Sequence, residues 1–411
     1  MRLKLILPTV DLTQMPEPAG CPRPDCGSPH VQLHQAVPKP LRDTQVDHTT
    51  VWRYRCVRCG HTFRVYPPGV SQAHTSARLR GVAVMLYVLG LSYGAVALAL
   101  EALGHPLSKS AVYYAVQAAG ERVPGLRRDA VRIPVGQVVV AALGADLTSV
   151  KCAGQWLTVG VGVDAVHGLA LTVDVLENGE AATLTAWIGE IAAAVGATVL
   201  VSDDADGFKA AADDTGLEQQ VCIAHVTRNT DAWAAHIIPK LAQDADGSLM
   251  AIRVDALQAI TDVAALWTLI HARQPTADAR RQLRTIHRRY QAAAGPRPGE
   301  RASLAYRLRL FSLDRWNLWG RLTRYRTWTG PEDAVLDGTN NATERAIGWW
   351  VKERYRTMRG YKREASITNV SRLIAWAGNQ LSGSGADLGV LIPSSMGDGG
   401  GARPAHARTK V

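Results

Sequence analysis

Three consecutive runs rich in β-branched residues decide the fold: QVVVAALGADLTSV (137–150), QWLTVGVGVDAV (155–166) and GLALTVDVL (168–176). Val, Ile and Thr fit the pleated surface of a sheet. The short KCAG and HG segments that separate the runs are typical of tight turns. The sequence therefore predicts three strands that follow one another as a meander.

Helix and strand patterns alternate after this meander. Residues 179–196 have the spacing of an amphipathic helix that ends at Gly196, and residues 206–216 predict a second helix. Short apolar runs at 197–204 and 219–225 predict one strand each. The expected order βββαβαβ places the chain in the α/β class, with helices against a sheet.

The segments that flank this pattern differ in composition. The N-terminal part is rich in Pro, Cys and His, a long later segment reads as almost wholly helical, and the C-terminal tail is low in complexity and is expected to be disordered. We expect five parts: a small module at 1–70, a helical module at 71–130, an α/β domain at 131–229 and 331–381, an all-α insertion at 230–330, and a disordered tail at 382–411.

The charge of the 411-residue chain is +10, with 47% hydrophobic and 20% charged residues. This excess favours a polyanionic partner, with nucleic acid first and an anionic membrane surface second. No apolar run is long enough for a spanning helix, and residues 1–14 lack the pattern of a signal peptide. We therefore expect a cytoplasmic, nucleoid-associated protein without a membrane partner.

Four of the six cysteines occur in two closely spaced pairs. Cys21 and Cys26 form C-x4-C, and Cys56 and Cys59 form C-x2-C followed by Gly60. Two such pairs can supply the four soft ligands of a structural Zn²⁺ site, as in a zinc ribbon. The alternative is a set of four reduced cysteines without metal. Possible substitute ligands are His30, His34, His48 and His61.

Residues 74–120 have the cadence of a helix-turn-helix, in which Ser108 caps the last helix. That helix would present side chains suited to DNA phosphates and base edges: Lys109, Ser110, Tyr113 and Tyr114. The alternative is a plain three-helix bundle.

Three carboxylates stand where a structural role is unusual. Asp146 lies inside the first strand, Asp203 ends a very apolar strand, and Glu344 lies on a late helix. Hard oxygen ligands of this kind suit Mg²⁺ or Mn²⁺. The alternative for Asp203 is a cap or turn role, and the adjacent Asp204 leaves the register of the second acid open.

Glu344 itself permits two interpretations. With Asn341 as N-cap, Glu344 would occupy the third position of a capping box. Alternatively, the spacing Glu344, Ile347, Gly348 and Val351 places the carboxylate on the helix face that turns toward the core.

Three blocks of sequence resemble the RNase H-like DDE transposases of bacterial insertion sequences: GADLTSVKCAGQW (144–156), VSDDADGFKAAADDTGLEQQVCIAHVTRN (201–229) and DGTNNATERAIGWWVKERYRTMRGYK (337–362). The resemblance is closest to the Mutator type, and it covers roughly residues 20–380. It implies an RNase H-like mixed sheet, with an N-terminal zinc ribbon and helix-turn-helix that are usual in the family.

The resemblance also implies roles for individual residues. Asp146, Asp203 and Glu344 would bind Mg²⁺ and catalyse attack on a DNA phosphodiester. Roles in support of the site, by bracing it or by orienting Glu344, fall to Cys222, His225, Asn340 and Asn341. Their alternatives are a buried Cys, a satisfied strand-end His and helix capping.

The segment after Glu344 alternates cations with aromatic rings (Trp349, Trp350, Tyr355 and Tyr361), a pattern that suits DNA. The proposed DNA contacts are Arg345, Lys352, Arg354, Arg356 and Arg359. Residues 279–290 are a second, weaker candidate, and a solvated charged face is the alternative for both.

We therefore expect an insertion-sequence transposase that binds the terminal inverted repeats of its element and a target duplex, as a homodimer or larger assembly on double-stranded DNA. The alternatives are an RNase H-like nuclease without strand transfer and an inactive DNA-binding regulator.

Overall fold

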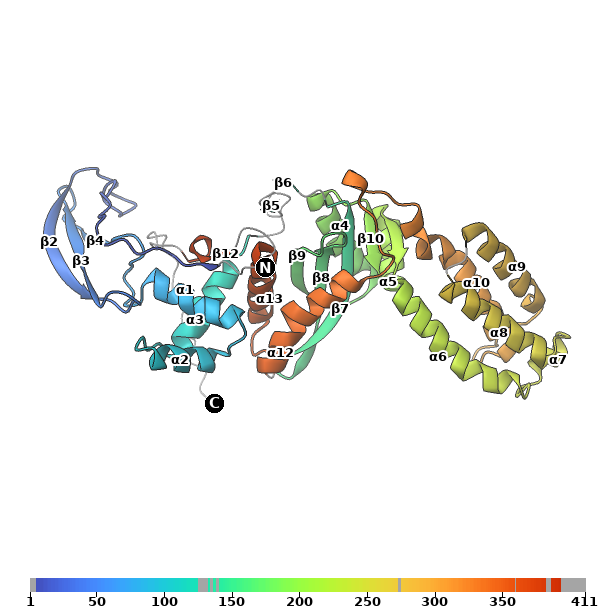
Figure 1. Cartoon of the computed structure of the whole chain (residues 1–411). Helices are drawn as coiled ribbons and strands as arrows, with labels where there is room; N and C mark the ends of the chain where they lie inside the picture. The colour runs from blue at the N-terminus through green and yellow to red at the C-terminus, as the bar shows by residue number, and fades with distance from the viewer. Residues whose placement is uncertain are drawn as a thin grey trace. The chain divides into compact units, whose positions relative to one another are not determined.

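The computed structural model describes residues 5–124, 132–133, 136–137, 140–272, 275–358, 360–381 and 386–392. The chain forms two compact units (Figure 1). The first unit comprises Met1–Pro124, Ile133–Val135 and Arg354–Val411, and the second comprises Gly125–Arg132 and Gly136–Glu353. Short strands β5 (Arg132–Ile133) and β6 (Gly136–Gln137) follow the N-terminal helices along the chain.

The first unit opens with a small antiparallel sheet of β2 (Val31–Pro40), β3 (His48–Cys56) and β4 (Thr62–Val65). The turn between β3 and β4 contains Gly60 in the left-handed region, with a φ of 71°, where glycine is favoured because it lacks a Cβ. Cys56 ends β3 and Cys59 lies in this turn, whereas Cys21 and Cys26 precede β2 along the chain.

Three helices follow in the first unit: α1 (Ala77–Val88), α2 (Tyr93–Ala102) and α3 (Lys109–Glu121). Each begins after a serine whose hydroxyl accepts a backbone N–H of the first turn, as Ser108 does from Ala111. The predicted cap at Ser108 is confirmed.

The C-terminal part of the chain packs on these helices, which differs from the division expected from the sequence. Helix α13 (Glu364–Leu381) lies against α3, whereas residues 331–381 were expected to belong to the α/β domain. The reason is a long-range fit: Gly120 of α3 has no side chain, so the backbone of Asn369 on α13 can approach closely.

Part of the expected disordered tail is ordered. Strand β12 (Ala386–Asp387) pairs in parallel with β1 (Leu5–Ile6), and the 3-10 helix η5 (Leu388–Val390) follows it. Leu388 and Leu391 are fully buried, so these apolar side chains fix a stretch whose composition resembles a linker. Residues 393–411 lie outside the described residues.

The second unit is built around a mixed five-stranded sheet. The strands lie in the order β11-β10-β7-β8-β9, with β10 parallel to both β7 and β11, and with β8 antiparallel to β7 and β9. The predicted order βββαβαβ is confirmed by these elements: β7 (Ala142–Cys152), β8 (Gln155–Asp164), β9 (Ala170–Leu176), α4 (Ala181–Val195), β10 (Val199–Ser202), α5 (Asp206–Thr215) and β11 (Glu218–Val221).

Helices cover both faces of this sheet. A Cβ added at Gly160 of β8 would meet the Trp187 ring of α4, and one added at Gly144 of β7 would meet Thr343 of α11 (Asn341–Ala346). Helix α11 continues through the π-helix η4 (Ile347–Lys352) into α12 (Glu353–Met358). The two approaches lie on opposite faces because successive residues of a strand alternate in direction.

The predicted all-α insertion is present, although its first helix begins earlier than residue 230. Strand β11 ends at Val221 and α6 starts at Ile223, so Cys222 is the junction and residues 223–225 form the first turn of α6 instead of the predicted strand. The helices are α6 (Ile223–Leu241), α7 (Ser248–Ala251), α8 (Ala256–His271), α9 (Thr276–Tyr290) and α10 (Leu304–Leu322), and the 3-10 turns η2 (Arg324–Arg326) and η3 (Pro331–Asp333) follow them.

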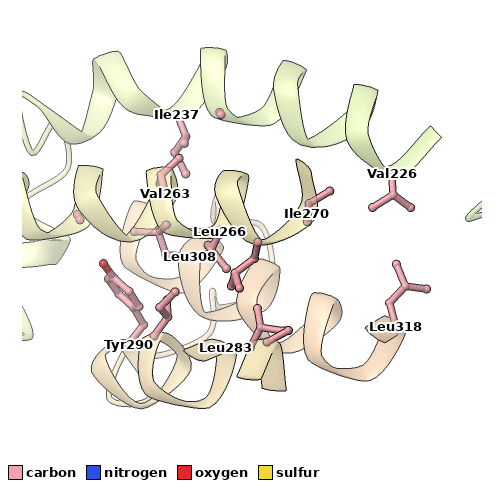
Figure 2. Close-up of a cluster of buried hydrophobic side chains, with 14 of the residues drawn as sticks. Val226, Ile237, Val263, Leu266, Ile270, Leu283, Tyr290, Leu308 and Leu318 are labelled. Carbon is pink, nitrogen blue, oxygen red and sulfur yellow. The ribbon is translucent and has the colours of Figure 1, made fainter. Parts of the chain in front are cut away.

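A continuous apolar core holds these helices together (Figure 2). Ile237 of α6, Leu266 of α8, Leu283 of α9 and Leu308 of α10 are all buried in it. None of the described helices combines the length and the apolarity that a membrane span requires.

Replacing Gly120 with alanine should destabilise the first unit. The added Cβ would lie 2.4 Å from the backbone O of Asn369, so a helix must shift, and we expect a loss of about 1–3 kcal/mol in the free energy of unfolding. Gly94→Ala in α2 is the matched control, since the nearest atom there is Ser92 Oγ at 4.0 Å. Denaturant unfolding of the full chain followed by circular dichroism measures both, and equal losses would contradict the close approach.

Candidate active site

The register of the parallel strands brings the first two candidate acids to the same level. Gly144 of β7 pairs with Val201 of β10, and Asp146 and Asp203 each follow two residues later. Asp146 shares the face of Gly144, because side chains alternate along a strand. Both acids therefore lie at the edge of the sheet where β10 ends.

Asn340 fixes the third segment to this edge. Its side-chain Nδ2 donates to the Ala145 carbonyl at 3.1 Å, its Oδ1 accepts from Thr343 Oγ1 at 2.6 Å, and its backbone N–H points at Cys222 Sγ at 3.2 Å. Asn340 is buried, so all of these bonds are shielded from water. The start of α11 is thereby held against β7 and the junction before α6.

The capping interpretation of Glu344 is wrong. Helix α11 has Asn340 rather than Asn341 as its N-cap residue, and no side chain caps its first turn. Asn341 is exposed. Glu344 instead turns toward His225, and the distance from Glu344 Oε1 to His225 Nδ1 is 3.6 Å.

The predicted acids are close enough to influence one another. Burial raises the pKa of Asp146 to about 6, and the negative charges of Asp203 and Glu344 add to the rise, while the Leu147 N–H and His225 oppose it. A carboxylate amid other carboxylates in a partly dry site attracts a cation. The structure thus gathers Asp146, Asp203 and Glu344 from segments distant in sequence.

The structure separates the two candidates for the second acid. Asp204 is paired with Lys209 at 3.2 Å and with the buried Arg315 of α10 at 3.3 Å. Asp203 accepts the Ala205 N–H at 3.1 Å, and within the described part of the chain it has no ion pair. Asp204 is therefore neutralised by structural partners, whereas Asp203 remains available.

The four N-terminal cysteines lie close together in the first unit and could hold a zinc ion. Their sulfurs approach at 3.7 Å (Cys21 to Cys59) and 3.8 Å (Cys26 to Cys56). A tetrahedron with Zn–S bonds of about 2.3 Å has edges of roughly 3.8 Å. Backbone N–H groups of Cys59 and Arg58 lower the pKa of Cys56 to about 7, whereas burial raises the pKa of Cys21 to about 11, so Cys56 is the thiolate most readily offered to a metal.

The expected DNA-binding residues of α3 occupy two environments. Lys109, Ser110 and Tyr114 are exposed near its start. Tyr113 is half-buried, and its hydroxyl lies 3.3 Å from Ser366 Oγ. The polar end of α3 is therefore open to a ligand, while Tyr113 helps to hold α13.

The expected DNA-binding residues after Glu344 also divide. Arg345, Lys352 and Arg356 are exposed. Arg354 is buried, donates to the Val88 carbonyl at 2.9 Å and stacks over the Tyr87 ring. Arg354 is therefore not exposed for the predicted contact with DNA. A planar guanidinium can satisfy its donors and stack on an aromatic ring inside a protein. Arg359 lies outside the described residues.

The aromatic side chains of this segment differ in the same way. Trp349 is exposed, at 74% of its surface, whereas Trp350 and Tyr361 are buried. Among these rings, Trp349 is the one best placed to stack on a base.

One contributor to the site, Gly144, was not identified from the sequence. A Cβ at Gly144 would lie 2.6 Å from Thr343 Oγ1, so the approach of α11 depends on this glycine. A glycine inside a strand pattern often marks such a close approach, and that signal was present.

No protein-family model matches the chain, and no curated protein is similar enough to count as a match. Function must therefore be inferred from the residues and their geometry.

Replacing Asp146 with asparagine should stabilise the metal-free protein at pH 7. The folded-state pKa of about 6 lies above the ordinary value of 3.8, so folding disfavours the charged carboxylate. Removing the charge should add about 1–3 kcal/mol to the free energy of unfolding. The gain should shrink as the pH falls through 6 and should vanish below 3.8, where the aspartate is protonated in both states.

Thermal unfolding at several pH values, in buffer without divalent cations, measures this effect. Asp206→Asn is the control, because Lys209 lowers the pKa of the exposed Asp206 and neutralisation there gives no gain. A less stable Asp146→Asn protein at pH 7 would contradict the raised pKa of Asp146.

Proposed function

We propose that the protein is the DNA transposase of an insertion sequence, which binds the ends of its element and catalyses Mg²⁺-dependent strand cleavage and strand transfer. The observation that carries the proposal is the gathering of Asp146, Asp203 and Glu344 at one edge of the mixed sheet. Partial burial disfavours the charged form of Asp146, and the negative charges of Asp203 and Glu344 add to this cost, as expected of a functional site.

The arrangement of the sheet supports the same proposal. The order βββαβαβ, with an acid in the first strand, an acid after the fourth and an acid on a late helix, is the pattern in which the sequence resembles the RNase H-like DDE transposases. An all-α insertion between the second and third acids accounts for their long separation in the chain.

The donor set suits a hard divalent cation. Asp146 and Asp203 offer carboxylate oxygens from adjacent strands, and Glu344 offers a third from α11. Mg²⁺ held by these residues would activate a water or a 3′-hydroxyl and stabilise the leaving oxygen of the phosphodiester. The chain itself supplies the position of these acids, through the bonds of Asn340 to Ala145 and Cys222.

Exposed cations provide candidate contacts to the DNA backbone. Arg345 and Lys352 lie within eight residues of Glu344 and are exposed, so they would bind phosphates next to the reacting strand. Lys109 and Ser110 at the exposed start of α3 would contact the element end. The excess charge of +10 suits such a partner. Two ends must be held together for transfer, so we propose a dimer or larger assembly on double-stranded DNA.

The proposal is tested with a duplex that carries the inverted repeats flanking the gene. With Mg²⁺ the protein should cut at the repeat and join the end to a target duplex. Asp146→Asn, Asp203→Asn and Glu344→Gln should each reduce cutting by at least about 100-fold, with binding of the repeat retained in a mobility-shift assay. Cutting without joining would instead indicate a nuclease, and binding without cutting by the unaltered protein would indicate a DNA-binding regulator.

The neighbouring aspartates should respond differently. Asp204→Asn should chiefly lower stability, because it leaves the buried Arg315 without that ion pair, with an expected loss of about 1–3 kcal/mol. Asp203→Asn should chiefly lower the rate of strand cutting. Parallel measurement of thermal unfolding and of cutting distinguishes the two, and a reversed result would make Asp204 the second acid.

A further inference from the structure

Cys222, His225 and Glu344 form a compact group of three different donor types. Cys222 directly precedes α6, His225 lies in its first turn, and Glu344 comes from α11. One ligand atom of each residue lies within 4.8 Å of the other two. The spacing C-x2-H places the sulfur and the imidazole about one helical turn apart, which lets both reach a common point.

Two atoms of this group are buried without a partner. Nδ1 of His225 and Oε1 of Glu344 are inaccessible to solvent and form no hydrogen bond with any described residue, although each side chain is partly exposed elsewhere. A buried polar atom without a partner is destabilising and rare. Their separation of 3.6 Å is too long for a hydrogen bond. Two ligand atoms that share a tetrahedral zinc ion lie roughly 3.3 Å apart, so a small cation between them would satisfy both.

Burial raises the pKa of the Cys222 thiol, while backbone N–H groups around the sulfur oppose that rise. The Asn340 N–H points at Cys222 Sγ at 3.2 Å, and the backbone N–H groups of Ala224 and His225 are also directed at it. Such donors stabilise a thiolate and hold it in one orientation, as outer-shell bonds do in metal sites. Cys222 is fully buried, so the thiolate would need a cation as partner.

We propose that Cys222, His225 and Glu344 bind one divalent cation of the Zn²⁺ class, at a site distinct from the four N-terminal cysteines. Sulfur and imidazole donors select Zn²⁺ over Mg²⁺, which takes oxygen ligands. Three protein ligands leave a fourth position open. If the proposed transposase activity holds, Zn²⁺ at this site draws on Glu344 and competes with Mg²⁺ for it; the binding itself does not depend on that activity.

A Co²⁺ titration of the full chain tests the site. One equivalent of Zn²⁺ is added first to fill the four-cysteine site, and Co²⁺ then reports a thiolate ligand through a charge-transfer absorption band. The unaltered protein should show this band and bind one further equivalent. Cys222→Ser should abolish it, and His225→Ala should weaken Co²⁺ binding by at least about 10-fold.

Cys152→Ser is the matched control, since Cys152 is another buried cysteine of the same unit and should leave the titration unchanged. Circular dichroism checks folding, and Glu344→Gln, which retains the thiolate, tests the site if Cys222→Ser does not fold. Absence of a difference between the unaltered protein and the folded Cys222→Ser or Glu344→Gln variant would overturn the proposal. The readout uses no DNA, so a failure of strand cutting leaves it unaffected.

Discussion

The side chain of Asn340 is the constraint on which the candidate site depends. It joins the start of α11 to the Ala145 carbonyl on β7, one residue before Asp146, while its backbone N–H meets Cys222. The contact is possible only because Gly144 has no side chain to separate helix from strand. Asn340 thus links α11 to β7 through its side chain and to Cys222 through its backbone N–H, and these buried bonds hold the helix that carries Glu344 against the strand that carries Asp146.

Local patterns in the sequence predicted much of the fold. The β-branched runs predicted β7, β8 and β9, and Gly196 predicted the end of α4, because these features act within a few residues. The acids were also detectable, since Asp146 in a strand and Glu344 on an inward face conflict with local preference. Such conflicts often mark functional sites.

Features that depend on distant partners were not predictable in the same way. The burial of Arg354 requires the Tyr87 ring and the Val88 carbonyl, more than 250 residues earlier in the chain. The order of residues 386–392 requires β1 as a pairing partner. From composition, the segment around Arg354 and residues 386–392 were both expected to be exposed to solvent. A single tertiary contact outweighs such a weak compositional preference. The pairing of Asp204 with Arg315 is of the same kind, and it distinguishes Asp204 from Asp203, which forms no ion pair with the described residues.

Glu344 belongs to two donor sets, and their chemistry determines how it can be used. With Asp146 and Asp203 it completes a set of oxygen atoms, whereas with Cys222 and His225 it completes a mixed set of sulfur, nitrogen and oxygen. Hard cations favour the first set and borderline cations the second. Because Asn340 restrains both β7 and Cys222 relative to α11, neither set can be widened without disturbing the other. If both proposed sites bind their cations, the identity of the available cation would decide which set Glu344 serves.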